Sequence, residues 1–410
     1  MAKERIIAGL DLGTTKICAI IGEATVNGEV RIVGVGTAAS YGIRTGMVVN
    51  IDQTAAAIRK AVEDAERMAG VKVGSLYTGI AGGHIRGLDS RGVVAVSHPD
   101  KGITDADVRR VLDAAKAVTM PKDTELIHLL PQGFIVDDQP GIKEPIGISG
   151  VRLEAEVYII TGAVTAAQNV YKSVNQAGRR IKELVLQPLA SSYAVCSPDE
   201  TELGVAVVDI GGGTTDIALF FEGALRYIAV VGLGGRNVTN DVAIGLSTPL
   251  DQAEQIKKEH GCSFLSMVDD KEKIQVPMIG GRPPKEVPKG LLSSIIQPRM
   301  EEIFNFTLRE IRRSDYAELL PAGIIVTGGG AMLEGSTQQV EQVFGMPAKI
   351  GMPQGVTGLA DAIQSPIYST AVGLLHYSVS RTDDKIQRDR YQLGPSGTFS
   401  KVKQWFNNFL

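Results

Sequence analysis

Two glycine-threonine turns have the residue types needed to bind phosphate. The first is Asp11-Leu12-Gly13-Thr14-Thr15-Lys16, and the second is Asp209-Ile210-Gly211-Gly212-Gly213-Thr214-Thr215-Asp216. Each turn joins two apolar runs rich in β-branched residues, which predicts two β-hairpins in two similarly built lobes. Glycine lets backbone N–H groups approach a phosphate, threonine adds donors, and Asp11 and Asp209 can hold Mg²⁺ through its water shell. One such turn could simply close a hairpin, but two in one chain favour a phosphate site.

A third glycine turn follows the apolar run 324–326. Gly328, Gly329 and Gly330 can lie flat under a nucleoside where a Cβ would collide, although a single glycine triplet is also compatible with an ordinary loop.

Two segments rich in small residues are expected to position these turns. The segments 187–194 and 368–375 combine Ala, Ser, Thr and Gly at helical spacing. Small side chains allow two helices to approach closely, which suits a crossing point or hinge between lobes. Either segment alone is equally well explained as an ordinary core helix.

Composition limits the classes of protein to be considered. The chain has 410 residues, which predicts two to four lobes, and its formal net charge of −4 makes nucleic acid an unexpected partner. The three cysteines are scattered, which predicts neither a metal site nor disulfides and fits a reducing cytoplasm. No apolar stretch approaches the roughly 20 residues that span a bilayer, and the polar start leaves no room for a signal peptide.

The end of the chain differs in character. Residues 381–397 are polar and charged and predict a flexible linker, and residues 398–410 follow with an amphipathic pattern. At about 100° per residue, one face of such a helix collects large apolar side chains: Phe399, Val402, Trp405, Phe406, Phe409 and Leu410. This pattern predicts a helix on an anionic lipid surface, held weakly enough that many copies must act together. The alternative is a helix that docks on the protein's own core.

In this order, the three turns and two helices resemble the actin superfamily. The segments 147–157, 279–284 and 368–377 resemble the FtsA family of bacterial cell-division proteins, and the resemblance runs from residue 6 to the last residue. It implies an α/β, actin-like two-lobed ATPase fold with a small α+β insert, called 1C, and a C-terminal amphipathic helix. The implied boundaries are 1–83, 163–197 and 366–380 for subdomain 1A, 84–162 for 1C, 198–245 and 305–365 for 2A, and 246–304 for 2B.

Within 1C, the residues themselves predict strands over 92–97, 126–136 and 153–160. They also predict a helix capped by Thr104 or Asp105, with apolar residues at helical spacing through Val118.

The resemblance also implies the site residues for ATP and Mg²⁺. Asp11 and Asp209 would organise Mg²⁺, and a larger set would cradle the phosphates: Gly13, Thr14, Thr15, Gly211, Gly212, Gly213, Thr214 and Thr215. Lys16 would reach a phosphate or face solvent, and Gly328 to Gly330 would meet the nucleoside. Glu254 and Lys257 match a ribose or adenine contact, with a solvated helix face as the alternative. Gln187 would position the attacking water, or merely start a helix, so hydrolysis is expected to be slow at most.

The implied partners are FtsZ, through its C-terminal peptide, further copies of the chain, the membrane and later division proteins. The implied location is the cytoplasmic face of the inner membrane, at the division site. Arg282 and Arg299 in 2B would meet acidic groups of the FtsZ peptide, unless they form a solvated basic face. The alternatives are a pilus-assembly adaptor of the same fold and a small-molecule kinase. A kinase needs an aspartate to accept the proton of the acceptor, and the sequence offers no clear candidate.

Overall fold

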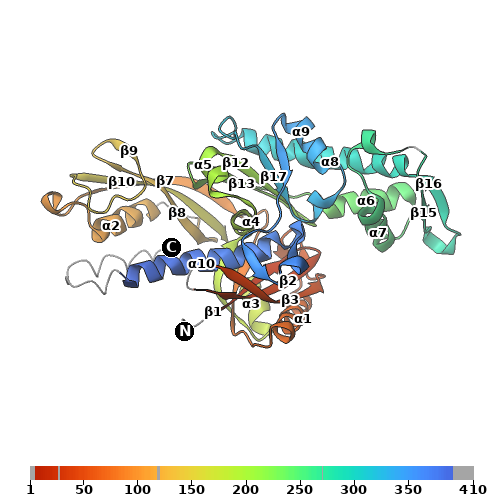
Figure 1. Ribbon diagram of the computed structural model, residues 1–410, viewed down its shortest axis with the longest axis horizontal. Coiled ribbons are helices and arrows are strands. Elements are labelled where there is room, and N and C mark those ends of the chain that lie inside the picture. The colour runs from red at the N-terminus through yellow and green to blue at the C-terminus, as the bar shows by residue number, and fades with distance from the viewer. Residues whose placement is uncertain (1–4, 26–27, 118–120, 270, 391–410) are drawn as a thin grey trace.

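The computed structural model describes residues 5–25, 28–117, 121–269 and 271–390. Two sheet-based lobes lie one above the other at the centre of Figure 1, and a smaller subdomain extends at each end of the long axis. The two similarly built α/β lobes expected from the paired glycine turns are therefore confirmed.

The first lobe contains a six-stranded mixed sheet in the order β11-β6-β1-β2-β3-β19. Its strands are β1 (Arg5–Leu12), β2 (Lys16–Ala24), β3 (Val30–Ala39), β6 (Ser75–Ile80), β11 (Arg180–Leu186) and β19 (Val356–Gly358). β1 and β2 form the predicted first hairpin, with a turn at residues 13–15. β19 pairs with β3, so the chain returns to the first sheet earlier than the expected boundary at 366. This pairing supplies partners for a sheet edge that would otherwise be open.

The second lobe contains a five-stranded sheet in the order β14-β13-β12-β17-β18. Its strands are β12 (Val205–Ile210), β13 (Thr215–Phe221), β14 (Ala224–Val231), β17 (Ile324–Thr327) and β18 (Ala348–Ile350). β12 and β13 form the second predicted hairpin, and β17 runs parallel to β12. This parallel pairing brings the triple-glycine turn beside the second phosphate turn.

Helices cover both faces of the first sheet (Figure 1). α1 (Ile51–Ala69) and α3 (Val164–Gln176) lie on one face, and α4 (Gln187–Val195) and α10 (Ser369–Arg390) lie on the other. α4 and α10 cross in direct contact, because a Cβ on Gly373 would lie only 1.7 Å from the carbonyl oxygen of Ala190. The small residues of the two segments therefore serve the close crossing that the sequence predicted.

Short elements complete the two lobes. They are the strands β4 (Ile43–Arg44) and β5 (Met47–Val48), the helices α5 (Pro198–Leu203) and α9 (Ser336–Phe344), and the 3₁₀ turns η4 (Gly329–Met332), η5 (Ala360–Ile363) and η6 (Pro366–Tyr368).

The insert forms a separate α+β module with its own core. Its sheet has the order β7-β10-β8-β9, from β7 (Arg86–Ala95), β8 (Thr124–Val136), β9 (Gln139–Ile142) and β10 (Arg152–Ala163), with η1 (Pro99–Lys101) and α2 (Asp105–Lys116). Thr104 caps α2 as predicted, in a reciprocal capping box with Asp107. Val108, Val111 and Leu112 are buried against the sheet.

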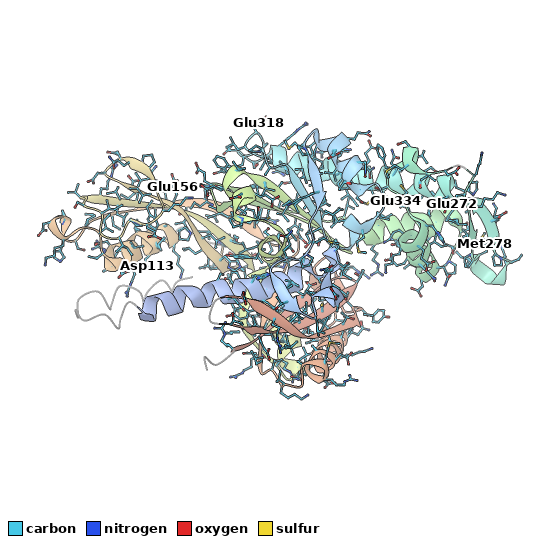
Figure 2. The ribbon with its side chains drawn as sticks, in the orientation of Figure 1. Asp113, Glu156, Glu272, Met278, Glu318 and Glu334 are labelled. Carbon is cyan, nitrogen blue, oxygen red and sulfur yellow. The ribbon has the colours of Figure 1, made fainter. Side chains whose placement is uncertain are left out.

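The subdomain at the other end is mainly helical. It contains α6 (Gly235–Leu246), α7 (Leu250–His260), η2 (Leu265–Met267), β15 (Lys273–Val276), η3 (Ile279–Gly281), β16 (Lys285–Pro288) and the start of α8 (Lys289–Arg312). Figure 2 shows Met278 at this end of the molecule and Asp113 at the opposite end, in the insert. The two small subdomains are therefore far apart along the long axis.

The last helix is longer than expected. α10 continues through Arg390, so residues 381–390 of the predicted linker are helical. This stretch has neither Gly nor Pro and is rich in residues that favour helix, which explains the continuation. The predicted membrane helix, 398–410, lies outside the described residues. Among the helices that the structure describes, none combines the length and apolar character needed to cross a bilayer.

Candidate functional site

The two phosphate-type turns touch each other across the boundary between the lobes. Each is closed by the same backbone hydrogen bond, from Gly13 N to Lys16 O at 3.0 Å and from Gly211 N to Thr214 O at 2.9 Å. A Cβ on Gly212 would lie 2.5 Å from the side chain of Thr15. Glycine is therefore needed at the tip of the second turn for the two turns to meet.

Buried carboxylates lie directly behind these turns. Asp11 and Asp209 each have 8% of their surface exposed. Burial raises the pKa of Asp11 to about 7; Lys16 opposes this shift, and Asp209 adds to it. Burial also raises the pKa of Asp209, although its carboxylate accepts hydrogen bonds from Ser191 (2.6 Å) and Thr370 (3.2 Å). Negative charge concentrated in a buried site favours a bound cation.

A third carboxylate, Asp216, was not among the predicted site residues. It lies directly opposite Asp209 in the β12–β13 ladder, with 4% of its surface exposed. Burial, followed by repulsion from Asp209, raises the pKa of Asp216 to about 8. Its Oδ2 accepts a hydrogen bond from Thr214, but its Oδ1 has no hydrogen-bond partner among the described residues. One difference between the two turns could have pointed to Asp216: the first turn ends in Lys16, whereas the second ends in this aspartate.

These carboxylates fit a hydrated Mg²⁺ better than direct coordination. Within the described residues, no three or more His, Cys, Asp or Glu side chains come together in a metal-ligating group. Mg²⁺ usually keeps several of its waters and uses only one or two carboxylates. The unpartnered oxygen of Asp216 and the buried pair Asp11 and Asp209 can accept hydrogen bonds from such waters.

Gln187 lies at the site and contacts the first turn. Its Nε2 donates to Asp11 Oδ1 at 3.2 Å and to the carbonyl oxygen of Leu12 at 3.3 Å. A Cβ on Gly79 of β6 would come within 2.9 Å of the Gln187 side chain, so glycine there leaves space for it. The side chain is held by the first lobe, and its Oε1 accepts no hydrogen bond from a described residue.

The side chain of Lys16 is bound to the segment that precedes α10 and lies near enough to Asp11 and Asp209 to lower the pKa of both, against the larger effect of burial. Its Nζ donates to the carbonyl oxygen of Ile367 at 2.8 Å and lies 4.2 Å from the ring centroid of Tyr368. Its predicted phosphate contact would require the side chain to leave this position. The solvent-facing alternative is incorrect in this structure, because the ammonium group is bound to the segment that precedes α10.

The triple-glycine turn lies against the second phosphate turn. A Cβ on Gly328 would lie 2.3 Å from Asp209 Oδ1, and one on Gly330 would lie 2.3 Å from the Ile210 side chain. A Cβ on Gly329 would meet only Ile367, at 3.7 Å. Two of the three glycines are thus required by contact with β12, and only Gly329 leaves open space. A cavity of about 480 Å³ adjoins this turn and is lined in part by Met332.

Glu254 and Lys257 support the second turn from behind. The Lys257 ammonium donates to Gly235 O (3.0 Å), Thr239 Oγ1 (2.9 Å) and Glu254 (2.6 Å). Burial opposes ionisation of Glu254, but attraction to Lys257 and hydrogen bonds from Lys257, Thr239 and Lys258 together lower the pKa of Glu254. Gly235 N in turn donates to Gly211 O at 2.9 Å. The pair therefore connects α7, through the start of α6, to a phosphate turn, and a plain solvated face is excluded for Lys257.

The two arginines proposed for partner binding differ in environment. Arg299 forms ion pairs with Asp241, at 2.5 Å, and with Glu302, which raise its pKa. Arg282 is exposed in the loop before β16 and has no ion pair among the described residues. Arg282 is thus directly accessible, whereas Arg299 joins α8 to α6.

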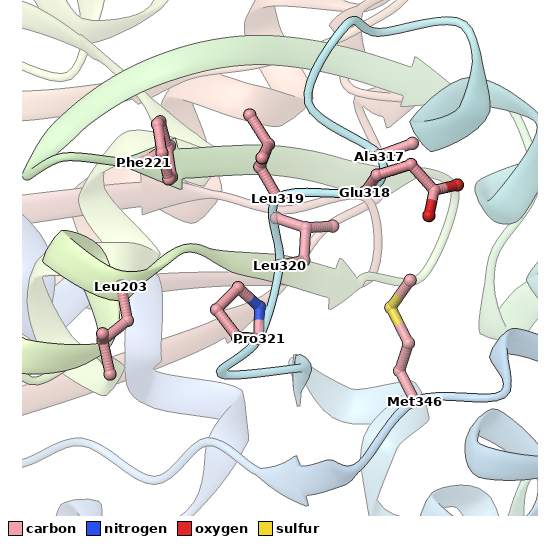
Figure 3. A pocket seen from close by; sticks show the side chains of 8 residues that line it. All are labelled: Leu203, Phe221, Ala317, Glu318, Leu319, Leu320, Pro321 and Met346. Atoms are coloured by element: carbon pink, nitrogen blue, oxygen red, sulfur yellow. The ribbon is translucent and has the colours of Figure 1, made fainter.

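A second cavity lies away from this site. It has a volume of about 320 Å³ and is lined largely by apolar residues, including Leu203, Phe221 and Leu319 (Figure 3). Leu203 precedes β12 and Phe221 ends β13, so the cavity lies at the end of the second sheet opposite the glycine turns. It takes no part in the candidate site.

Comparisons with known proteins agree with this arrangement. The family model "Cell division protein FtsA" matches residues 206–373, and "SHS2 domain inserted in FTSA" matches residues 82–161. The cell division protein FtsA of Pseudomonas aeruginosa is 46% identical over 380 residues, covering 93% of this chain and 91% of that protein. FtsA of Neisseria meningitidis is 44% identical and covers 99% of both chains, and FtsA of Escherichia coli is 40% identical over 380 residues, covering 91% of this chain and 90% of its own.

Solved structures show the same fold at low identity. The type IV pilus biogenesis complex PilM–PilN matches with a TM-score of 0.65 and 17% identity, covering 91% of this chain and 98% of that chain. MreB5 of Spiroplasma citri bound to ADP matches with a TM-score of 0.55 and 13% identity, covering 95% and 99%. The expected actin-like fold is confirmed, and the matched insert lies within two residues of the expected boundaries 84–162.

Proposed function

Because the chain belongs to the FtsA family of cell-division proteins, we propose that it tethers FtsZ to the membrane during bacterial cell division. In this proposal it binds ATP with Mg²⁺ between its lobes and polymerises on the cytoplasmic face of the inner membrane. From there it recruits later division proteins to the division site.

The meeting of the two glycine turns supports ATP binding most directly. A Cβ on Gly212 would meet the Thr15 side chain and one on Gly213 would meet the Thr14 side chain, so the two turns meet between the lobes where phosphates would bind. Bound Mg²⁺ would neutralise charge on the phosphates, and Asp11 and Asp209 would hold its waters. Gly329 and the Glu254–Lys257 pair are assigned to the nucleoside end of the site.

Hydrolysis in this proposal is slow. Gln187 is fixed by Asp11 and the Leu12 carbonyl oxygen, which leaves its Oε1 to accept a hydrogen bond from water. A glutamine can orient the attacking water but is a poor base. Asp216 holds a proton near neutral pH and therefore contributes little basicity until a cation lowers its pKa.

The membrane and FtsZ assignments rest on other segments. The apolar face from Phe399 to Leu410 would bind anionic lipid, and one short helix with few charges would hold only weakly. Polymerisation would then strengthen attachment by bringing many such helices to one surface. The exposed Arg282, with Arg299, would receive acidic groups of the FtsZ C-terminal peptide.

Co-sedimentation with vesicles tests the whole proposal. FtsZ, anionic vesicles and ATP are mixed with the intact chain or with the variant W405E/F406E, and the pellet is analysed for both proteins. We expect FtsZ to pellet only with the intact chain. If neither protein pellets with vesicles, the membrane assignment is overturned.

A pilus-type adaptor is the second candidate, favoured by the fold match to the PilM–PilN complex. The same experiment separates the two functions. Pelleting of this chain without FtsZ would keep the lipid-binding tail and move the partner assignment toward the pilus-type adaptor.

A further inference from the structure

A histidine of the insert contacts the backbone at the start of the first connecting helix. His128 lies in β8 with 3% of its surface exposed, and its Nε2 accepts a hydrogen bond from the backbone N–H of Leu186 at 3.0 Å. Leu186 is the last residue of β11, an edge strand of the first sheet, and immediately precedes α4. Because an N–H donates to it, Nε2 must carry a lone pair, and the ring nitrogen acts as an acceptor.

The next residue along the chain is the one that contacts the candidate site. Gln187 begins α4 and donates to Asp11 Oδ1 and the Leu12 carbonyl oxygen. The His128 contact is therefore a side-chain hydrogen bond to the residue directly before Gln187. The insert is therefore separated from a phosphate-turn carboxylate by only two hydrogen bonds and one peptide unit.

The imidazole ring also packs against an aromatic ring of α10. Tyr377 of α10 lies edge-on to it, with ring centroids 5.8 Å apart and an interplanar angle of 64°. The Tyr377 hydroxyl donates to Glu183 of β11 at 2.6 Å, which fixes the tyrosine ring in turn. The strand β8 of the insert, β11 and α10 are therefore joined at His128, where packed rings leave little room for independent movement.

We propose that His128 is a positioning residue through which the insert sets the place of Gln187 in the nucleotide site. A partner that shifts the insert would then change ATP affinity, and ATP would change the affinity of the insert for that partner by the same factor. This inference rests on the proposed ATP binding, and it adds a route by which a partner bound to the insert regulates ATP affinity.

A structural role alone must be distinguished from positioning. A buried backbone N–H needs an acceptor, so losing His128 costs stability under either interpretation. Only the positioning role predicts that the affinity for ATP changes relative to that for ADP, because Gln187 is assigned to the water that faces the terminal phosphate. A conservative acceptor should also restore that affinity ratio.

The test uses the full chain and three variants. H128F keeps an aromatic ring beside Tyr377 but removes the acceptor, and H128Q offers an amide oxygen in its place. H84F is the matched control, because His84 Nδ1 also accepts a backbone N–H, from Ala163 at 3.3 Å, at a different junction of the insert and away from residue 186 in the chain. ATP and ADP affinities are measured with Mg²⁺ by titration calorimetry, and hydrogen exchange is followed in peptides containing residues 183–190.

We expect H128F to lower the ATP-to-ADP affinity ratio about fivefold, the effect of losing one hydrogen bond, whereas H84F leaves the ratio unchanged and H128Q recovers most of it. Exchange at the α4 junction should rise in nucleotide-free H128F. An unchanged ratio in H128F, or an equal loss in H84F, overturns the inference. If the unmodified chain binds no ATP, the proposed function itself fails, and unchanged exchange at 183–190 in H128F would then overturn the His128 contact separately.

Discussion

The hydroxyl of Thr370 donates a 3.2 Å hydrogen bond to Oδ2 of Asp209, which ties the first turn of α10 to the carboxylate beside the second glycine turn. Ser191 of α4 donates to the same oxygen at 2.6 Å. Both connecting helices therefore donate a hydrogen bond to one carboxylate of the other lobe. A bound cation that attracts this carboxylate would weaken its hydrogen bonds to both helices.

Replacing Thr370 by Val should loosen this junction. The T370V side chain has nearly the same shape but cannot donate, so we expect the free energy of unfolding to fall by about 1 kcal/mol. ATP affinity should fall as well. Thermal unfolding with and without Mg·ATP measures both effects. T307V is the control, because Thr307 is also buried but donates only to Ile303 O within α8; an equal loss of ATP affinity in T307V would contradict the assignment.

Asp216→Asn should change the pH dependence of stability. The folded-state pKa of Asp216, about 8, lies above the unfolded value near 3.8, so the folded state binds the extra proton between these values. Stability contributed by the protonated carboxyl is thus fully present below about pH 4 and is lost as pH rises toward 8. D216N has no proton to lose. We expect its unfolding free energy, measured by denaturant titration without nucleotide or Mg²⁺, to decline less from pH 5 to pH 8 than that of the unmodified chain.

Lys257→Met should weaken the support of the second glycine turn. The variant loses hydrogen bonds to Gly235 O, Thr239 and Glu254, and we expect unfolding to become easier by about 2 kcal/mol. Nucleotide affinity should fall with it. K258M is a matched control, since Lys258 pairs with the same Glu254 but is largely exposed. Equal nucleotide affinities in the two variants would show that the contacts of Lys257 do not influence nucleotide binding.

Gly328→Ala should be far more harmful than Gly329→Ala. Gly328 has φ of +80°, and its Cβ would lie 2.3 Å from Asp209 Oδ1, whereas a Cβ on Gly329 has no neighbour closer than 3.7 Å. Backbone strain alone should cost G328A roughly 1–3 kcal/mol of stability. Thermal unfolding compares the two variants. If G329A lowers ATP affinity but leaves thermal stability nearly unchanged, the nucleoside binds at Gly329.

Arg299 can be tested without reversing its charge. R299E would place a third carboxylate beside Asp241 and Glu302, so loss of FtsZ-peptide binding in that variant could result from local charge repulsion. D241N keeps the arginine and weakens its internal ion pair. If Arg299 contacts the peptide, fluorescence anisotropy should show binding kept or strengthened in D241N and lost in R299M. Unchanged binding in R299M would remove Arg299 from the contact and leave Arg282 as the exposed candidate.

Local patterns were the most predictable part of the fold. The two hairpins depend on glycine turns between β-branched runs, and the cap of α2 depends on Thr104 and Asp107, only three residues apart. Such features involve near neighbours in the chain, so residue types alone identify them. The predicted linker is wrong over residues 381–390, which continue α10. This segment is polar but contains neither Gly nor Pro to end the helix.

Contacts between distant segments could not be predicted in this way. β19 joins the first sheet by pairing with β3, more than 300 residues earlier in the chain, and three residues give no signal of that choice. Lys16 could be placed in the first turn but not against Ile367, because the direction of a long side chain depends on what packs around it.

The sequence by itself determined that this chain has two glycine-threonine turns, two small-residue helices and a segment of α+β character between residues 92 and 160. Each of these follows from periodicity, turn chemistry and capping among residues close in sequence. The tertiary structure alone decided that Asp216 is buried with an unpartnered oxygen and that His128 of the insert holds the junction before Gln187. Burial and long-range hydrogen bonds arise only when separate elements pack together. Residue type alone therefore does not show whether the side chain of an aspartate or histidine is solvated or belongs to a site.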